Sequence, residues 1–474
     1  MIKEKRKTAG GLWNFVDNLQ GDKVVWMIVL MLILISIVAV FSSTPLLAIQ
    51  NKTSRISIVS EQLLVAAGGI AVIIGLYNIK SIRFYRLVSQ LGFIVSLSML
   101  LFLALHLNFG IVKAIQLNSA WRVIKVPGIQ IHVVEVVKVA MVMYLAWAVN
   151  AYKNDSFGIA NALAKTKTFA FMEKPISKRM MYIYMPIGLI CLLIMPGGTS
   201  SAIFVGGIML LTVLIGGIPW KDVLFAIPVI LVLGIGCLVA NKASGNKLFP
   251  HFDSSMKRIT ENTNYHLNRL KTLPRGSVEF QKSMDKVKQP VSAKIAIHEG
   301  GIFGKGPGKS TQRYVVPVMF EDYMYSFIIE EYGLVGGILI IILYGSLLAR
   351  GSLITRMCEN LFAKTAVEGL VILIVGQAAM HIVINLDVGI LTGQTLPLIS
   401  HGNSSFLSFC IAFGVILAIS RMANQKMRLV SEHIDMESEG DVNTISAEMG
   451  GAKALNSLQA PSLDEKEWRK NDKE

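Results

Sequence analysis

Long apolar runs, each about the length of a membrane-crossing helix, alternate with short polar segments along most of the chain. A helix needs about 20 apolar residues to cross the hydrocarbon core, where it satisfies its own backbone hydrogen bonds. The pattern therefore predicts ten transmembrane helices, over residues 24–42, 61–79, 86–106, 132–150, 180–196, 200–218, 222–240, 323–349, 365–386 and 404–421. The expected fold class is an all-α polytopic membrane protein.

The charged residues between these runs predict the orientation and the domain organisation. Lysine and arginine gather at both ends and in alternate inter-helix segments, which favours a cytoplasmic location for both termini. We expect a cytoplasmic segment over 1–23 and a transmembrane domain over 24–421. A large extracytoplasmic loop over 241–322 is expected between the seventh and eighth helices. The polar, acid-rich segment 422–474 is predicted to be a disordered cytoplasmic tail.

Composition supports the membrane class and excludes others. With 53% hydrophobic and 16% charged residues and a mean hydropathy of +0.54, the 474-residue chain is too apolar for an ordinary soluble protein. The net charge of +15 is explained by the basic inter-helix segments, so nucleic-acid binding is not predicted. The four cysteines are scattered without metal-ligand spacing, and neither a zinc site nor a disulfide framework is indicated.

Residues 296–333 place a glycine-rich basic loop directly before an apolar helix that contains carboxylates. Closely spaced glycines let several N–H groups converge on an anion, and Lys305, Lys309 and Arg313 add positive charge. The loop does not match the nucleotide-binding pattern GxxxxGK[ST], because Phe303 stands where its first glycine is required. Two interpretations remain open: an anion site, or a flexible loop with incidental lysines.

Polar residues recur at helical spacing on three predicted helices. If the helix after the loop begins near Pro317, Asp322 lies at its outer end on the polar face, within reach of the loop and of water. Ionisable residues within membrane spans usually face a bundle interior or a hydrated cavity, so a cavity among the three helices is predicted. The three stripes are Asp322, Ser326 and Glu330; Glu135 and Lys138; and Gln377, His381 and Asn385.

Structural interpretations stand beside these functional ones. Glu135 and Lys138 alternatively do no more than neutralise each other. Glu330 and Glu331 alternatively form a structural pair between helices, with Lys138 as the candidate partner. His381 is more simply a hydrogen-bonded interior histidine than a metal ligand, because no second ligand lies at matching spacing.

Three segments carry a resemblance to a known family. GGIFGKGPGKSTQRYVVP followed by D-x-x-x-x-x-x-x-E-E-x-G resembles the signature of the SEDS proteins, membrane peptidoglycan glycosyltransferases of the FtsW and RodA type. INLDVGILTGQTLPLISHGNSSF is similar to that family's segment between the last two helices. NSAWRVIK, with Glu135 and Lys138, resembles two further motifs. The resemblance covers roughly residues 20–425.

The resemblance implies roles for individual residues. Asp322 matches the family's proposed catalytic aspartate. Positions implied in binding the substrate or its diphosphate are Arg258, Gln289, Lys305, Gly306, Gly308, Lys309, Ser310, Gln312 and Arg313. Polar residues expected to line the cavity or to be structural are Arg122, Glu135, Lys138, Glu330, Glu331, Gln377, His381, Asn385, Ser400, Ser404 and Ser405.

Four positions depart from the family pattern: Gly197 and Val318 replace an aspartate and a glutamate, and His401 and Asn403 replace a tyrosine and a glycine. Glu321 offers a carboxylate one turn from Val318.

The implied activity is the polymerisation of lipid II into glycan strands. The 4-hydroxyl of one sugar attacks the anomeric carbon of a lipid-linked glycan, and undecaprenyl diphosphate leaves with inversion. Asp322 is the expected base. Nearby cations lower the pKa of such a carboxylate whereas burial raises it, and the sequence leaves the balance open. A divalent cation, Mg or Mn, bridging Asp322 and the diphosphate is a further hypothesis, although no metal ligands are assigned.

The resemblance also implies partners and a location. A class B penicillin-binding protein is the expected transpeptidase partner, together with other membrane proteins of the division machinery. The chain is expected in the bacterial inner membrane at the division septum, since GQTLP and the acidic tail favour the division branch. The alternatives are an elongation-type, RodA-like role, a flippase or transporter for lipid-linked precursors, and a noncatalytic scaffold.

Overall fold

The computed structural model describes most of the chain between residues 20 and 449, with side chains described up to residue 427. The described ranges are 20–117, 120–158, 161, 174–224, 236, 263–316, 318–388 and 393–449. The chain divides into two compact units, Met1–Asn424 and Gln425–Glu474. In the second unit the structure describes only the last part of one helix.

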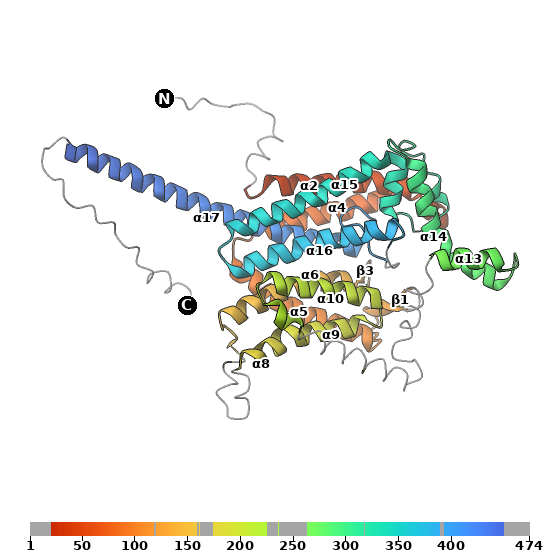
Figure 1. Ribbon diagram of the computed structural model, residues 1–474, viewed down its shortest axis with the longest axis horizontal. Helices are drawn as coiled ribbons and strands as arrows, with labels where there is room; N and C mark the ends of the chain where they lie inside the picture. Colours follow the sequence, from red (N-terminus) through yellow and green to blue (C-terminus); the bar gives the residue numbers. More distant parts are fainter. Residues whose placement is uncertain are drawn as a thin grey trace. The chain divides into compact units, whose positions relative to one another are not determined.

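Helices make up most of the described part of the first unit (Figure 1). Those before the glycine-rich loop are α2 (Lys23–Ser43), α3 (Pro45–Gln50), α4 (Arg55–Asn78), α5 (Ile82–Ala104), α6 (Val133–Lys153), α8 (Pro175–Arg179), α9 (Met185–Ile194), α10 (Thr199–Ile215), α13 (Thr263–Thr272) and α14 (Val278–Gly300). A π-helical turn, Met180–Tyr184, joins α8 to α9. After the loop come α15 (Met324–Met357), α16 (Leu361–Asn385) and α17 (Asn403–Met449).

Eight of the described helices are long and apolar enough to cross a membrane, counting α8, the π-turn and α9 as one. A ninth apolar helix, α10, is shorter. The predicted span over 222–240 lies mostly outside the described residues, so the count of ten remains a prediction. The predicted class of helical membrane protein is confirmed. α6 and α16 are largely buried, whereas α5 exposes most of its apolar surface, as a lipid-facing helix would.

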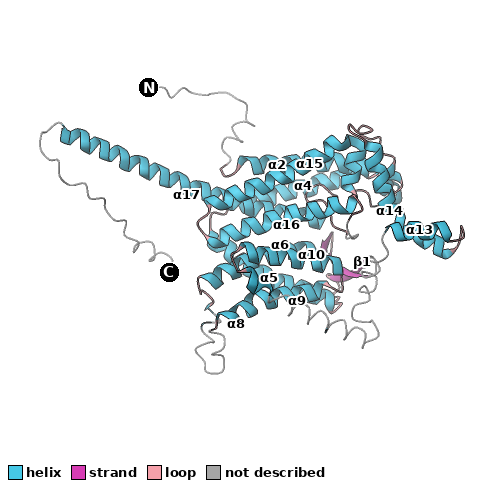
Figure 2. Cartoon of the chain, viewed as in Figure 1, coloured by secondary structure: helices cyan, strands magenta, loops and turns pink. Residues whose placement is uncertain are grey.

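A small antiparallel sheet, which the sequence analysis missed, lies between α5 and α6. Its strands are β1 (Lys113–Leu117), β2 (Ala120–Val126) and β3 (Ile129–His132), paired in the order β1-β2-β3. Pro127 and Gly128 make the tight turn between β2 and β3, and Gly128 takes a positive φ of 80° there. The strands lie at the same end of the helices as α14 (Figure 2). The sheet brings Arg122, on β2, to this end.

The predicted extracytoplasmic loop contains two helices, α13 and α14, that were not anticipated, and α14 packs along α15. Asp387, just after α16, holds both. Its carboxylate accepts a hydrogen bond from the Thr263 hydroxyl at 2.7 Å and pairs with the Lys294 ammonium at 2.6 Å. Asp387 has a φ of 57°, a conformation that aspartate tolerates better than most residues.

The most consequential irregularity is a break in α15 at Gly333, where φ is 71° and ψ is −172°. The break removes the helical partners of the neighbouring backbone groups, and the glycine-rich loop replaces them. The four replacing hydrogen bonds are Leu334 N–H to Gly301 O (2.9 Å), Val335 N–H to Ile302 O (3.3 Å), Lys305 N–H to Glu330 O (2.9 Å) and Gly306 N–H to Glu331 O (2.9 Å). The loop is thus joined to the helix through its backbone, and we call this contact the loop–helix splice.

Glycine is required in the splice because the two backbones nearly touch. A Cβ on Gly304 would lie 2.2 Å from the carbonyl oxygen of Glu331, and one on Gly333 would lie 2.1 Å from that of Ile302. Both distances are far shorter than any real carbon–oxygen contact, so a side chain at either position would push the loop out of the break.

The helix α17 continues to Met449. The first part of the predicted disordered tail is therefore helical here, while residues 450–474 lie outside the described residues.

We predict that Gly304→Ala destabilises the protein far more than Gly308→Ala. Both glycines have positive φ, 81° and 77°, but a Cβ on Gly308 meets nothing within 4 Å. The Gly308 variant should lose only the conformational cost of about 1 kcal/mol, whereas the clash at Gly304 should raise the loss to ~3 kcal/mol or more. The measurement is the apparent melting temperature of each purified variant in detergent. Equal losses would contradict the splice.

Candidate active site

Asp322 lies on the turn before α15, because that helix begins at Met324 and not near Pro317 as the sequence suggested. Its backbone N–H donates to Val318 O at 3.1 Å, and its carbonyl oxygen accepts from the Asn385 side chain at 3.0 Å. The carboxylate is half-buried beside Gly393, on which a Cβ would stand 3.5 Å from both carboxylate oxygens. Asp322 is therefore held by its backbone from two directions, with its acid group facing a glycine.

Burial and one cation set the acidity of Asp322. Burial raises the pKa of its carboxyl group to about 6, and the positive charge of Arg122 opposes that rise. The neighbouring Glu321 has a pKa raised to about 7, by burial and then by the negative charge of Asp322. The balance that the sequence left open is therefore decided by burial, and the opposing cation comes from β2.

Arg122 reaches this place through the small sheet. Its Nε donates a hydrogen bond to the carbonyl oxygen of Gly197, and a Cβ on Gly198 would lie 3.7 Å from a guanidinium nitrogen. Gly197 is one of the four departures from the family pattern. The resemblance predicts an aspartate at this position, whereas here the backbone carbonyl of a glycine contacts Arg122.

Behind Asp322, the polar stripes of α15 and α16 meet. The Asn385 side-chain oxygen accepts from both the backbone N–H and the hydroxyl of Ser326, at 2.9 and 2.6 Å. His381 Nε2 lies 3.3 Å from the N–H of Tyr325, so Nδ1 carries the proton and donates to Gln394 O at 2.7 Å. The interpretation of His381 as a hydrogen-bonded interior histidine is confirmed.

Lys138 is the centre of a second buried polar group. The residue is 2% exposed, and its ammonium pairs with Glu135 at 2.7 Å. It also donates to the side-chain oxygens of Gln377 at 2.6 Å and Gln394 at 3.1 Å. Ser405 donates to Glu135 at 3.0 Å. Glu135 and Lys138 therefore do form an ion pair, and Lys138 also joins a hydrogen-bonded network with α16 and the last loop.

The serines of the last motif bind backbone groups around this network. Ser400 donates to Glu321 O at 2.8 Å, which fixes the residue before Asp322. Ser404 donates to Gln130 O at 2.6 Å and accepts from the His132 N–H at 3.1 Å, which ties α17 to β3.

Two of the departures have structural partners. The His401 N–H donates to Phe320 O at 2.9 Å, and its ring nitrogen Nδ1 lies 2.9 Å from the Gln62 side-chain oxygen. The Asn403 side chain donates to Glu61 at 2.9 Å. Both side chains therefore attach the last loop to α4.

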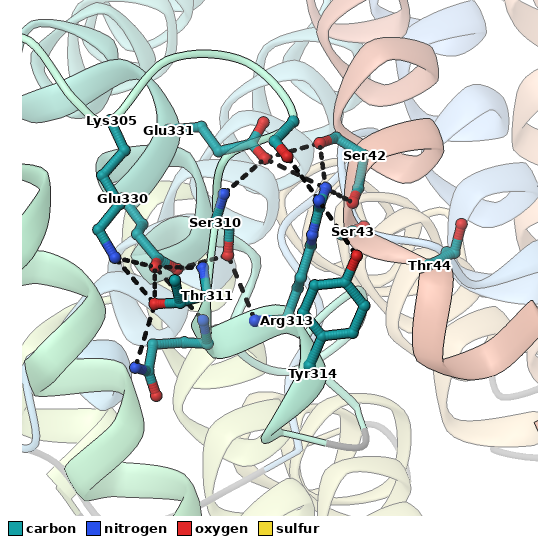
Figure 3. A network of polar contacts seen from close by, with 12 residues as sticks. Ser42, Ser43, Thr44, Lys305, Ser310, Thr311, Arg313, Tyr314, Glu330 and Glu331 are labelled. Atoms are coloured by element: carbon teal, nitrogen blue, oxygen red, sulfur yellow. Dashed lines mark hydrogen bonds and ion pairs between the residues drawn. The ribbon is translucent and has the colours of Figure 1, made fainter. Parts of the chain in front are cut away.

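The polar groups of the glycine-rich loop converge on Glu330, whose side chain is fully buried (Figure 3). Lys305 Nζ and the Thr311 N–H each lie 2.8 Å from Glu330 Oε1, and the Thr311 hydroxyl lies 3.0 Å from it. The Gln312 N–H approaches the same oxygen at 3.3 Å, and the Ser310 hydroxyl donates to Oε2 at 2.5 Å. The loop therefore does form an anion nest, and the anion in it is a side chain of this protein.

Glu331, also fully buried, holds the other side of the loop. It accepts from the Ser42 hydroxyl at 2.6 Å and lies 3.7 Å from Arg313 Nη1. Arg313 also donates to Ser42 O at 2.9 Å. The loop is thereby fastened to α2 as well as to α15 (Figure 3).

These contacts bear on two hypotheses from the sequence. The proposed pairing of Glu330 with Lys138 is wrong, because Glu330 pairs with Lys305. Among the described residues, Lys305 and Arg313 pair with the carboxylates of α15 and not with Asp322, while Lys309 is exposed. Whether the loop binds a ligand stays a prediction.

Two further predicted positions, Gln289 and Arg258, are in the segment before the glycine-rich loop. Gln289 is half-buried on α14, and Arg258 lies outside the described residues. Within the described part of the chain, no group of three or more His, Cys, Asp or Glu side chains is placed to hold a metal ion. The sequence analysis missed Gln394 and Thr395, which connect Lys138 and Gln377 to the last loop.

These features define a multi-pass helical membrane protein with a buried polar centre and a half-buried carboxylate at one end. Comparison with known proteins specifies the family. The family FTSW_RODA_SPOVE, described as cell cycle proteins, matches residues 22–425. The chain belongs to this family.

One similar relative is "Probable peptidoglycan glycosyltransferase FtsW" of Caulobacter vibrioides, 29% identical over 46% of this chain and 50% of the relative. The chain thus spans about half the length of that relative. Among solved structures, a chain of "Structural coordination of polymerization and crosslinking by a peptidoglycan synthase complex" matches with a TM-score of 0.57 at 18% identity, covering 85% of this chain and 98% of the other. Thermus thermophilus RodA matches with a TM-score of 0.52, at the same identity and coverage. These likenesses show a shared fold.

We predict that Lys138→Met strongly destabilises the protein. Without the ammonium, Glu135 keeps a largely buried charge, and removing one partner of such a pair costs about 3–5 kcal/mol. The measurement is the apparent melting temperature in detergent. The double variant Glu135→Gln/Lys138→Met should lose less than the single variant, since it removes the uncompensated charge. A single variant as stable as the unmodified protein would contradict the prediction.

Proposed function

We propose that this protein is a peptidoglycan glycosyltransferase that polymerises lipid II. The observation that carries the proposal is the half-buried Asp322, fixed at one end of the helices with a carboxyl pKa of about 6. A base with a pKa near the working pH combines sufficient proton affinity with sufficient ionisation. The name of the Caulobacter relative supports the same activity.

In the proposed reaction, the ionised carboxylate of Asp322 accepts the proton of the acceptor sugar's 4-hydroxyl as that oxygen attacks the donor's anomeric carbon. The new glycosidic bond forms while the bond to the diphosphate oxygen breaks, which inverts the anomeric centre. The proton then resides on Asp322 and the electron pair leaves with undecaprenyl diphosphate. Gly393, beside the carboxylate, places no side chain against it.

The leaving diphosphate requires positive charge. Arg122 acts electrostatically on Asp322, and the exposed Lys309 is not engaged by Glu330. We assign these two cations to the diphosphate. If the reaction uses Mg²⁺ or Mn²⁺, the carboxylates of Glu321 and Asp322 are the residues that would hold it, and the ion would neutralise charge on the departing oxygen.

The biological setting proposed is septal wall synthesis at the bacterial inner membrane, with both termini in the cytoplasm. A class B penicillin-binding protein is the proposed partner, supported by the fold shared with a chain of a peptidoglycan synthase complex. Contacts with other division proteins belong to the same proposal. An elongation-type role is the alternative within the family.

A flippase is the second candidate, because a precursor transporter also needs charges between helices. The buried network around Lys138 argues against it. Among the described residues, the polar partners of that ammonium are side chains of α6, α16 and the last loop, and opening a path there would break the bonds to Gln377 and Gln394. A noncatalytic scaffold is the third candidate, and the lipid II assay described next distinguishes it from the enzyme and the flippase.

We predict that Asp322→Asn abolishes polymerisation while the protein remains folded in the membrane. The amide is nearly isosteric but cannot accept a proton, and losing a general base typically costs 10²–10⁴-fold in rate. The measurement is glycan formation from labelled lipid II, with and without the partner transpeptidase. Lipid II translocation without polymer from the unmodified protein would support the flippase, and neither activity would support the scaffold. Normal glycan length from the variant would reject the role of Asp322.

We predict that turnover falls as the pH drops through about 6, because the base is active only when ionised. Arg122→Gln removes the positive charge that opposes the raised pKa of Asp322. The acid limb of the turnover profile should therefore move to higher pH. The measurement is kcat against pH for both proteins at saturating lipid II. An unchanged limb in the variant would exclude Arg122 as the cation that tunes Asp322.

A further inference from the structure

The anion nest of the glycine-rich loop is already filled. Five donors from Lys305, Ser310, Thr311 and Gln312 converge on the fully buried carboxylate of Glu330. A sequence of this kind is usually interpreted as a site for an external phosphate. Here an external anion would have to displace a charged side chain that belongs to a transmembrane helix.

Two cations of the loop already have carboxylate partners, while Lys309 is exposed. Lys305 pairs with both Glu330 and Glu299, and Arg313 pairs with Glu331. Each of these two cations therefore already faces a carboxylate. An incoming diphosphate would find no unbalanced positive charge inside the nest, so electrostatics favours the internal anion.

The same carboxylate sits beside the loop–helix splice. The carbonyl oxygen of Glu330 accepts the Lys305 N–H while its side chain accepts the Lys305 ammonium. Both ends of one residue thus hold the loop against α15. The chain then runs from Gln312, whose carbonyl accepts the Val316 N–H at 3.0 Å, into the turn that carries Asp322.

We propose that Glu330 is a positioning residue: it is the resident anion of the glycine-rich loop, locks the loop in the break of α15, and so fixes the turn that bears Asp322. This inference rests on the proposed function for its catalytic part. The locking of the loop does not, because it concerns the fold alone.

The test compares Glu330→Gln with Glu299→Gln in the full-length protein in detergent. Glu299 bonds the same lysine from the exposed end of α14, so its variant removes a partner of Lys305 but leaves the nest filled. Trypsin cleavage after Lys305 and Lys309 reports the opening of the loop. The rate of this cleavage, relative to the unmodified protein, should rise about tenfold or more in Glu330→Gln and less than about twofold in Glu299→Gln.

Polymerisation kinetics supply the second measurement. A positioning role predicts that kcat falls about tenfold or more in Glu330→Gln while KM stays within about twofold, because the loss is confined to the transition state. Glu330→Asp keeps a carboxylate, so it should resist trypsin better and have a higher kcat than Glu330→Gln. If Glu330→Gln does not fold, Thr311→Val removes one donor from the loop side, at an exposed residue, and should shift both measurements in the same direction.

Several outcomes would overturn the proposal. Unchanged protease protection in Glu330→Gln would show that the loop is held by other contacts. Protection of the unmodified loop by inorganic pyrophosphate would show that the nest accepts an external anion. A change in KM alone would assign Glu330 to substrate binding. If the unmodified protein forms no glycan, the proposed function fails, while the protease measurement still decides whether Glu330 locks the loop.

Discussion

The break of α15 at Gly333 is the constraint on which the outer end of this protein depends. Backbone groups without partners are costly in a membrane protein, and irregular backbone is tolerated there only when protein covers it. The loop of residues 300–306 supplies that cover through four backbone hydrogen bonds. The approach is so close that side chains are excluded at Gly304 and Gly333, so the splice requires glycine at these two positions.

The same glycines therefore have a different purpose from the one a sequence motif suggests. Positive φ and close approach serve the joining of the loop to the helix, and the N–H groups that remain are directed at Glu330. The carboxylates that hold the loop and the carboxylate of Asp322 therefore interact with different cations. Lys305 and Arg313 balance the carboxylates of α15, whereas the cation acting on Asp322 is Arg122, brought by a strand from another part of the chain.

Local patterns predicted what depends on local spacing. The apolar runs revealed the helices, and the three-residue spacing of Glu135 and Lys138 anticipated an ion pair that lies on one helix face. Contacts between distant segments could not be predicted in this way. Nothing in the spacing distinguishes Lys305 from Lys138 as the partner of Glu330, because the choice depends on how the loop folds back onto α15. The sheet was missed because its strands are short, although the Pro127–Gly128 turn was a usable signal.

Gly197, one of the four departures from the family pattern, contacts the cation that acts on Asp322. Arg122 bonds to the backbone carbonyl there, and its positive charge acts on Asp322. Because burial alone would carry the pKa of Asp322 higher still, the opposing cation keeps the carboxylate largely ionised near neutral pH. A glycine at position 197 is thus compatible with a working base, since Arg122, which bonds to its carbonyl oxygen, favours the ionised form of Asp322.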